Sequence, residues 1–376
     1  MTVQALASAD LWFNWRNQLL GSDTFRRLAC RFLPTRWIAR RRAAALFDLV
    51  AGFVYSQVLL ACVRLGLFEI LAEGPQTLEV LARRLSLEAA AAERLLAAAA
   101  ALQLVQRRGG RRYGLGTLGA AMVGNSAVAA MVEHHAALYA DLADPVALLR
   151  GHATSSHLAA YWPYSGGREV PTPERVAPYT ALMSASQPLV ADELLDAYPM
   201  SRHRCLLDVG GGDGTFLLRA AERAPHLQLL LFDLPAVAQQ ASLRIQQRGL
   251  AHRARAVGGS FFSDPLPGGA DIATLVRVVH DHDDEAALQI LAATRRALLP
   301  GATLLLAEPM AGTTGAQAMG DAYFGFYLLA MGSGRPRSSD ELRSLLLAAG
   351  FESVRTLATR MPLQTSLMLA RTPLAQ

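Results

Sequence analysis

Along the first half of the chain, apolar residues recur every three or four positions among polar ones, which is the spacing of an α-helix. Three helical patterns follow one another between Leu46 and about Gly119, and two of them are "TLEVLARRL" and "EAAAAERLLAAAAALQL", in which apolar residues recur every three or four positions. The stretch "LVQRRGGRRYGLG" then predicts a short hairpin that turns on Gly109 and Gly110. The helical pattern continues over residues 121–200, where the looser segment "YWPYSGGREVPTPE" is predicted to join two domains or to cover one of them.

The second half of the chain alternates short apolar runs with helical patterns. The runs predicted as strands are "CLLDV", "LQLLLF", "ARAVGG", "IATLVRVV", "ATLLLAE", "SVRTLAT" and "TSLMLAR". This alternation predicts an α/β fold with a Rossmann-like, doubly wound sheet. Ser338 and Glu341 form a capping box that begins the helix "DELRSLLLAAG". The expected domains are an arm at 1–43, a helical, winged-helix-like domain at 44–195 that dimerises and covers the substrate, and the sheet domain at 196–376.

Helices followed by a basic hairpin also occur in winged-helix DNA-binding regulators, which is one alternative for this chain. A helix that reads base edges is polar, whereas "EAAAAERLLAAAAALQL" presents almost only alanine and leucine. This pattern favours helix packing over DNA contact and predicts no nucleic-acid partner. Such helices would expose more apolar surface to solvent than is usual for a soluble monomer. We therefore expect a homodimer formed through this domain.

Composition indicates a packed globular protein. The 376 residues are 52% hydrophobic and 18% charged, and the formal net charge is +5 with arginine as the only basic residue besides histidine. This charge suits an anionic surface but is too small to indicate nucleic-acid binding by itself. Three widely spaced cysteines, Cys30, Cys62 and Cys205, support neither a disulfide framework nor a cysteine-based metal site. A reducing, cytoplasmic location is expected.

The arm combines positive charge with aromatic rings. Residues 11–43 hold eight arginines and one acid, Asp23, and the interleaved rings are Trp12, Phe13, Trp15, Phe25, Phe32 and Trp37. Two interpretations stay open: a solvated basic arm whose rings pack on a neighbouring domain, or a peripheral contact with an anionic membrane. The chain begins without a basic segment followed by an apolar core, and no uninterrupted apolar run reaches the roughly 20 residues of a spanning helix.

The stretch "LLDVGGGDGTF", residues 206–216, places a glycine-rich turn directly after an apolar strand. Its glycines match neither the dinucleotide fingerprint nor the P-loop, which needs a lysine that this chain lacks. Ligands of doubly wound sheets bind beyond the carboxyl ends of the strands, where this turn lies. Asp208 and Asp213 flank the turn, and Asp233 ends the next strand about twenty residues on, where an acid binds ribose hydroxyls in nucleoside-binding sheets.

His280 follows the fourth predicted strand, so its ring is expected to face the same crevice as the glycine turn. The neighbouring residues His282, Asp281, Asp283 and Asp284 are interpreted as structural, with the acids in the first turn of the next helix. A metal site is disfavoured, because adjacent residues point in different directions and no distant cysteine or histidine cluster completes a ligand set.

Five motifs in order, "LLDVGGGDGTF", "FDLP", "FFSDPLP", "VRVVHDHDDEAAL" and "LLLAEPM", resemble those of the S-adenosylmethionine-dependent O-methyltransferases that include plant phenolic and acetylserotonin enzymes. The resemblance runs from about Leu46 to the end. Within that family, "LFDLVAGFVYSQVLLACVRLGLF" and "GDAYFGFYLLAMGSGRPRS" most resemble the bacterial demethylspheroidene (hydroxyneurosporene) O-methyltransferases of carotenoid synthesis. The resemblance implies S-adenosylmethionine as cofactor, S-adenosylhomocysteine as product and no metal. We expect a cytoplasmic enzyme, and a peripheral contact of the arm with the inner photosynthetic membrane stays one of the two interpretations.

Carried over residue by residue, the resemblance assigns the glycine turn to the methionyl side of the cofactor. Asp233 would bind the ribose and Phe261 would cover the adenine, while Ser260 stands where the family usually has an acid. The implied cofactor-binding residues are Asp208, Gly210, Gly212, Gly214, Asp233, Leu234, Ser260, Phe261 and Arg277.

The resemblance also implies that His280 is the general base and that Glu308 orients it. A second glutamate of the family is missing, since Pro336 falls near its position, so His280 would rely on Glu308 alone. Histidine, with an ordinary pKa of about 6.5, cannot ionise an alcohol outright, but it can accept the proton as the oxygen attacks.

Met183 matches a methionine that packs donor against acceptor, and the acceptor is expected to contact Trp162, Tyr323, Phe324 and Tyr327. Because no arginine fork or phosphate loop offers a handle for a polar substrate, the expected acceptor is a long apolar alcohol. The resemblance implies that this alcohol is an acyclic carotenoid with a tertiary hydroxyl. A phenol, a polyketide or a bacteriochlorophyll precursor is the alternative within the same enzyme class.

Overall fold

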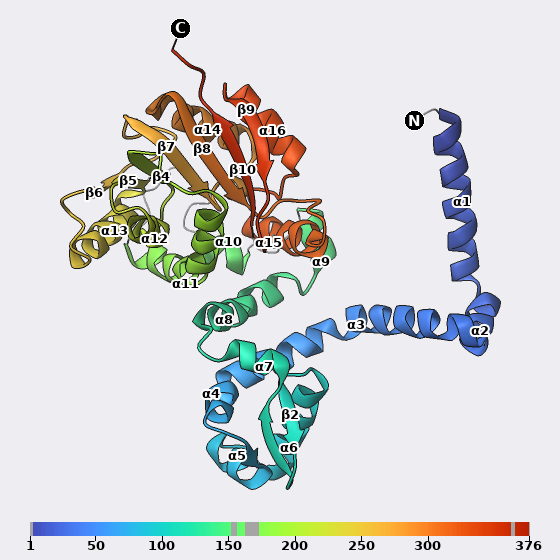
Figure 1. The fold of residues 1–376 in the computed structure, drawn as a ribbon. Coiled ribbons are helices and arrows are strands. Elements are labelled where there is room, and N and C mark those ends of the chain that lie inside the picture. Colours follow the sequence, from blue (N-terminus) through green and yellow to red (C-terminus); the bar gives the residue numbers. More distant parts are fainter. Residues whose placement is uncertain (1–2, 152–155, 162–172, 362–364, 376) are drawn as a thin grey trace. The chain divides into compact units, whose positions relative to one another are not determined.

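The computed structural model describes residues 3–151, 156–161, 173–361 and 365–375. The chain forms two compact units, Met1–Gly124 and Asn125–Gln376 (Figure 1). Trp162, expected at the acceptor, lies outside the described residues. Each unit is described by itself below.

The first unit is helical with a small sheet. Its helices are α1 (Val3–Gly21), α2 (Asp23–Arg31), α3 (Leu33–Arg64), α4 (Leu67–Ala72), α5 (Leu78–Arg84), α6 (Ala89–Ala101) and α7 (Thr117–Met122). Within the described part of this unit, β1 (Gln76–Thr77), β3 (Arg112–Leu115) and β2 (Val105–Arg108) pair in that order. The hairpin of β2 and β3 closes on Arg108 opposite Arg112, with Gly110 at a φ of +71°. The expected winged-helix-like hairpin is confirmed.

Helix α3 differs from what the sequence suggests. Asp48 interrupts its apolar run, yet the helix Leu33–Arg64 is long and apolar enough to cross a membrane by length and composition, with a mean hydropathy of 1.9 in its best window. Only 11% of that window is buried. The last turns pack inside the unit, where Leu60 and Cys62 are buried. The helix therefore exposes a long apolar surface rather than forming a core helix.

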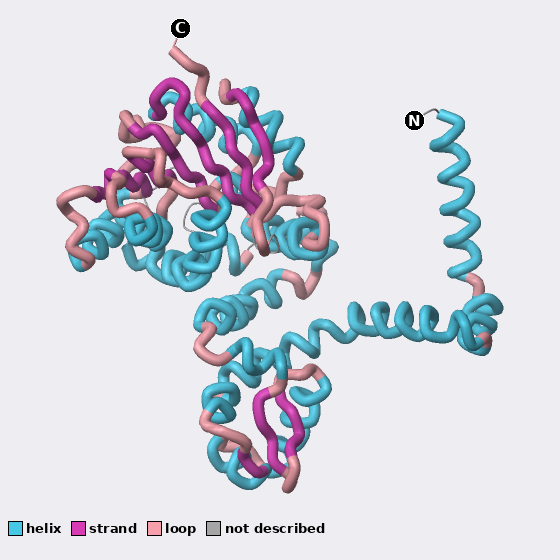
Figure 2. The backbone as a smooth tube through the Cα atoms, in the orientation of Figure 1, coloured by secondary structure: helices cyan, strands magenta, loops and turns pink. Residues whose placement is uncertain are grey.

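The described residues of the second unit form a seven-stranded sheet in the order β6-β5-β4-β7-β8-β10-β9 (Figure 2). The strands are β4 (Cys205–Val209), β5 (Gln228–Asp233), β6 (Ala254–Gly258), β7 (Ala270–Val276), β8 (Leu298–Glu308), β9 (Glu352–Leu357) and β10 (Ser366–Arg371). Strand β10 runs antiparallel to both neighbours, and the other pairings are parallel. All seven predicted strands are present, and the doubly wound α/β fold is confirmed.

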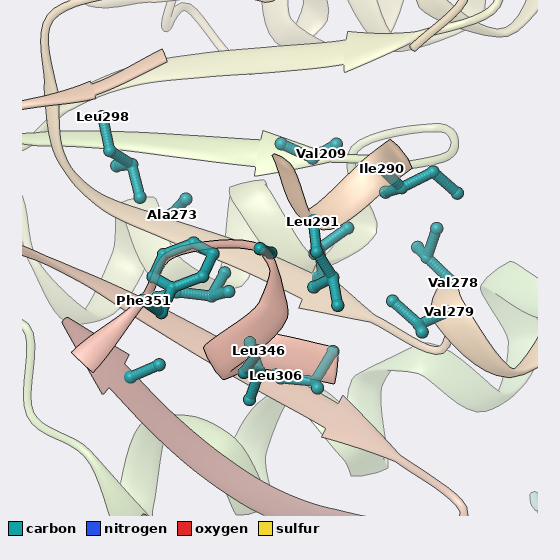
Figure 3. Packing of buried hydrophobic residues seen from close by; sticks show 14 of the residues in the cluster. Val209, Ala273, Val278, Val279, Ile290, Leu291, Leu298, Leu306, Leu346 and Phe351 are labelled. Atoms are coloured by element: carbon teal, nitrogen blue, oxygen red, sulfur yellow. The ribbon is translucent and has the colours of Figure 1, made fainter. Parts of the chain in front are cut away.

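Helices cover both faces of this sheet, which explains why its strands are apolar at successive positions instead of alternating. The helices described in this unit are α8 (Ser126–Asp141), α9 (Pro145–Leu149), α10 (His157–Tyr161), α11 (Pro173–Ala197), α12 (Thr215–Arg223), α13 (Pro235–Gln247), α14 (Asp284–Ala297), α15 (Phe324–Met331) and α16 (Ser339–Ala348); those that pack on the sheet are α11 to α14 and α16. On one face Ile290 and Leu291 of α14 and Leu346 of α16 pack on the strands (Figure 3). On the other face α11, α12 and α13 contribute Leu194, Phe216, Ile245 and their neighbours.

The helices between residues 125 and 195 cluster with the sheet unit, whereas the sequence placed them with the N-terminal domain. Leu138 of α8 and Leu158 of α10 share a core cluster with Tyr327 and Met331 of α15. Helical periodicity shows that these segments are helices but not which surface buries their apolar sides, so the division at Gly124 follows from packing.

Candidate functional site

The glycine turn lies between β4 and α12 and brings its backbone close to neighbouring side chains. Gly210, Gly212 and Gly214 have φ values of +67°, +60° and +84°, which side chains rarely adopt. A Cβ on Gly210 would lie 2.7 Å from Val278, just before His280. At Gly212 no described atom lies within 4 Å of such a Cβ, so this part of the turn is open. The turn thus packs against the strand end that carries His280 and leaves its tip accessible.

Two buried carboxylates lie at this turn. Thr274 donates a 2.7 Å hydrogen bond to Oδ1 of Asp208, whereas Oδ2 has no hydrogen-bond partner among the described residues. Asp233 accepts from the N–H groups of Gly212 at 2.8 Å and Leu234 at 2.7 Å. Burial raises the pKa of Asp208 to about 7 and that of Asp233 to about 6. An orphaned carboxylate oxygen and an open glycine turn could together hold a ligand with hydroxyl and ammonium groups.

His280 and Glu308 form a buried pair at the ends of β7 and β8. Nδ1 of His280 lies 2.5 Å from Oε2 of Glu308, and the other carboxylate oxygen accepts the N–H groups of Val278 and Val279 at 3.1 and 2.7 Å. These backbone bonds fix the carboxylate, and the carboxylate fixes the imidazole ring. Because Glu308 accepts at Nδ1, Nε2 is the ring nitrogen that this carboxylate does not hold.

Asp281 is a residue of this site that sequence reasoning assigned to the wrong role. It lies in a 3-10 turn, Val279–Asp281, before α14 begins, and is only 4% exposed. Its Oδ1 lies 3.1 Å from Nε2 of His280, so His280 does not rely on Glu308 alone. Burial lowers the pKa of His280, but the charges of Asp281 and Glu308 outweigh it and the net shift is upward. Burial raises the pKa of Asp281 to about 6. Asp283 and Asp284 do lie at the start of α14, as expected.

The backbone of the His280 turn is held by the segment after α15. Arg335 donates its N–H to the carbonyl of His280 at 2.9 Å, and the fully buried Arg337 donates to the carbonyls of Val279 and His282. A Cβ on Gly334 would lie 2.2 Å from the carbonyl oxygen of His280. The segment "SGRPRS", where the resemblance predicted a second glutamate, supports the histidine through hydrogen bonds to the backbone of its turn.

The other residues expected at the cofactor lie around the same strand ends. The ring of Phe261 packs near Phe232 and His282, with ring centroids 6.5 and 5.9 Å apart. The hydroxyl of Ser260 accepts the N–H of Phe262 at 3.3 Å.

Arg277, at a strained φ of +57°, reaches α11 instead of the glycine turn. It donates to Ser186 at 2.8 Å, to Gln187 at 2.5 Å and to the carbonyl of Met183 at 3.2 Å. Arg277 thereby ties Met183 to the end of β7.

Of the aromatic residues expected at the acceptor, Phe324 lies beside His280, and Tyr323 and Tyr327 adjoin Phe324. A π-helix, Ala318–Tyr323, precedes α15, and such turns often occur at functional sites. The ring of Phe324 meets that of His280 edge to face, with centroids 5.8 Å apart, and Tyr323 stacks on Tyr327.

Sequence reasoning missed the partners of these tyrosines. His134 and His135 on α8 lie 2.8 Å from the hydroxyls of Tyr327 and Tyr323 respectively. Burial lowers the pKa of both histidines, that of His134 to about 4. Both rings are therefore neutral at pH 7. Only the adjacent pair "HH" in an apolar helix could have signalled them.

Within the described ranges, no group of three histidine, cysteine, aspartate or glutamate side chains is placed to hold a metal ion. The groups that the site brings together are a carboxylate–histidine pair, the glycine turn and the aromatic rings of Tyr323, Phe324 and Tyr327.

Comparisons with known proteins identify both parts of the chain. Residues 139–352 match the model of the O-methyltransferase domain, and residues 47–125 match that of the O-methyltransferase dimerisation domain. Demethylspheroidene O-methyltransferase of Cereibacter sphaeroides is 43% identical over 95% of this chain and 94% of its own length. Acetylserotonin O-methyltransferase of Mus musculus is 30% identical over 87% of this chain and 88% of its own length.

Among solved structures, a methyltransferase of calicheamicin biosynthesis in its S-adenosylhomocysteine-bound form superposes with a TM-score of 0.71. It is 27% identical, and the match covers 89% of this chain and 98% of that one. The fold, the two matched domains and the full-length similarity agree, and the chain belongs to the O-methyltransferase family.

Proposed function

We propose that this O-methyltransferase transfers the methyl group of S-adenosylmethionine to the tertiary hydroxyl of an acyclic carotenoid of the demethylspheroidene or hydroxyneurosporene type. The observation that carries the chemistry is the buried pair of His280 and Glu308 at the strand ends beside the glycine turn. The acceptor class is supported by the 43% identity, over nearly the whole chain, to a demethylspheroidene O-methyltransferase.

The residues at the glycine turn fit the proposed cofactor. The open tip at Gly212 and the orphaned Oδ2 of Asp208 suit its methionyl part, and the carboxylate of Asp233 suits ribose hydroxyls. Phe261 and Leu234 flank the same strand end and suit the adenine. When bound, the cofactor supplies an electrophilic methyl group on a positively charged sulfur.

His280 would act as the general base. As the hydroxyl oxygen of the acceptor forms its bond to the methyl carbon, the carbon–sulfur bond breaks and the hydroxyl proton moves to Nε2 of His280. The products are a methyl ether, S-adenosylhomocysteine and an imidazolium that later loses its proton to water. Glu308 at Nδ1 and Asp281 at Nε2 place a carboxylate beside each nitrogen of that imidazolium, which stabilises its charge.

The wall beside His280 favours an apolar acceptor. Phe324 presents an aromatic ring, and the hydroxyls of Tyr323 and Tyr327 are hydrogen-bonded to neutral histidines. Because this wall offers no formal charge at pH 7, it discriminates against acidic substrates and suits a hydrocarbon that carries a single hydroxyl.

The test is methyl incorporation from labelled S-adenosylmethionine into a panel of hydroxycarotenoids, phenols and bacteriochlorophyll precursors. Preferential labelling of an acyclic hydroxycarotenoid supports the proposal. Preferential labelling of a phenol or a tetrapyrrole would contradict the proposed acceptor class but would still support methyl transfer from S-adenosylmethionine. No labelling together with a salt-sensitive shift of duplex DNA would favour the winged-helix regulator instead.

We further propose a homodimer, and we expect light scattering at micromolar concentration to give twice the chain mass of 40.3 kDa. The support is the match of residues 47–125 to a dimerisation domain and the exposure of Leu49 and Phe53 on α3, at 82% and 65%. Phe53→Asp should shift the mass toward that of one chain, because a charge in an apolar interface is left unpaired. Leu374→Asp, at an exposed position outside this helix, is the matched control, and a single-chain mass for the parent contradicts the proposal.

The pH dependence of kcat should move when Asp281 loses its charge. Because the neutral imidazole accepts the proton, kcat rises with pH through the pKa of His280, which Asp281 and Glu308 raise. Asp281→Asn removes one negative neighbour, so the pKa of His280 falls and the rising limb shifts to lower pH. The measurement is kcat across pH at saturating substrates. An unshifted limb would mean that Asp281 does not act on His280.

A further inference from the structure

We propose that the corner between α2 and α3 inserts into the surface of an anionic phospholipid bilayer. This inference concerns the first 43 residues, lies outside the methyl-transfer site and does not depend on which alcohol is methylated. It turns one of the two interpretations left open for the arm into a specific docking surface.

The corner is a folded unit and not a loose tail. Ser22 caps α2 by accepting the N–H of Phe25. The hydroxyl of Thr35 donates to the carbonyl of Ala29 at 2.9 Å, and the side chain of Arg36 donates to the carbonyl of Cys30 at 3.0 Å. These bonds satisfy carbonyls at the end of α2, so the two helices meet at a defined angle and carry their side chains as one surface.

Large apolar side chains lie exposed at this corner. Leu28, Phe32, Leu33 and Trp37 are 64%, 59%, 74% and 62% exposed. They occupy the last turn of α2, the connection and the first turns of α3. A soluble monomer seldom exposes so much apolar surface at one place. The corner is therefore expected to bind another apolar surface.

The positive charge of the arm indicates which kind of surface binds the corner. The arm, residues 1–43, has a net charge of +6, whereas the whole chain has +5, so residues 44–376 sum to −1. Arg27, Arg31, Arg40 and Arg41 beside the apolar side chains are exposed. Of the two acids of the arm, Asp10 and Asp23, the one at the corner is Asp23, and it is paired with Arg26. Apolar residues among arginines are the pattern of an interfacial segment, whose rings enter the acyl boundary while arginines meet anionic headgroups.

Two other occupants fit less well. A second copy of the chain offers no comparable negative charge, because its residues 44–376 sum to only −1. The dimerisation model also begins at residue 47, after the corner. A nucleic acid would pair with the arginines, but its phosphates would leave Leu28 and Leu33 in water. A bilayer satisfies both the charge and the apolar surface.

The intrinsic fluorescence of the full chain allows a direct test, because three of its four tryptophans lie in the arm. A background with Trp12→Phe, Trp15→Phe and Trp162→Phe leaves Trp37 as the single tryptophan. Vesicles of phosphatidylcholine with about one third phosphatidylglycerol should shift its emission to the blue, and lipids brominated on the acyl chain should quench it. Pure phosphatidylcholine should have a much weaker effect, and added salt should weaken the shift.

Vesicle sedimentation with variants separates the two contributions. Arg40→Gln with Arg41→Gln should weaken binding to the anionic vesicles by roughly 25-fold, at about fivefold for each arginine near the surface. Leu28→Ser, Phe32→Ser and Leu33→Ser together should abolish the blue shift of Trp37.

The matched control is Leu299→Ser with Leu347→Ser, at exposed positions outside the arm, and it should bind like the parent. The proposal is overturned if the anionic vesicles leave the emission of Trp37 unchanged, or if the triple serine variant binds as tightly as the control. A blue shift that grows with protein concentration without vesicles would assign the corner to a second copy. Methyl transfer measured in detergent is a separate readout, so failure of the proposed function would not be mistaken for failure of docking.

Discussion

Replacing His280 by alanine is expected to lower kcat by roughly 10² to 10⁴, the usual contribution of a positioned general base, and to leave the affinity for S-adenosylhomocysteine unchanged. The ring would act only while the proton moves, so its loss affects the transition state and not the bound product. Turnover with labelled donor gives kcat, and calorimetric titration with S-adenosylhomocysteine gives the affinity independently of turnover.

Glu308→Gln is the matched control for this prediction. If the amide oxygen accepts the N–H groups of Val278 and Val279, the NH2 group faces Nδ1 of His280 and donates to it, which places the ring proton on Nε2. The ring keeps its place but cannot accept the hydroxyl proton at Nε2, so the loss in kcat should approach that of His280→Ala. Turnover of His280→Ala at the parent rate, or greatly weakened product binding, would make His280 a structural residue.

The fold and part of the site follow from local features of the sequence. Seven apolar runs separated by helical patterns predict the sheet because each strand is buried on both faces. Once the sheet is predicted, residues at strand ends such as Asp233 and His280 are expected to meet at its carboxyl edge, whereas Glu308 was predicted from the resemblance to the family. The structure brings His280 and Glu308 to 2.5 Å.

Features that depend on packing between distant segments could not be predicted in the same way. Asp281 looks like a helix-capping acid in the sequence, and only the 3-10 turn that precedes α14 buries it against His280. His134 and His135 lie nearly two hundred positions from the tyrosines that they contact. The apolar length of α3 was hidden by Asp48, because a single charge interrupts a run without ending a helix.

Asp233→Ala is expected to weaken binding of S-adenosylhomocysteine by roughly 10² or more, because hydrogen bonds to a charged group contribute about 1.5 to 3 kcal/mol each. The carboxylate also accepts the N–H of Gly212 at 2.8 Å, so its removal loosens the glycine turn. Cofactor contacts made equally in ground and transition states affect KM and not kcat. The apparent KM for S-adenosylmethionine should therefore rise while kcat at saturation stays near that of the parent.

The pH dependence of binding tests the same assignment through charge. Burial raises the pKa of Asp233 to about 6 in the free protein, and ribose hydroxyls that donate to the carboxylate favour its ionised form. The complex therefore has the lower pKa, and affinity is lost as pH falls through about 6. Asp233→Asn cannot titrate there and should bind weakly at all pH values. Asp208 titrates in both proteins, and because the charge of Asp233 helps to raise its pKa to about 7, the Asp208 step should move to lower pH in Asp233→Asn. If the affinity for S-adenosylhomocysteine depended on pH in the same way in the parent and in Asp233→Asn, Asp233 would not be a cofactor-binding residue.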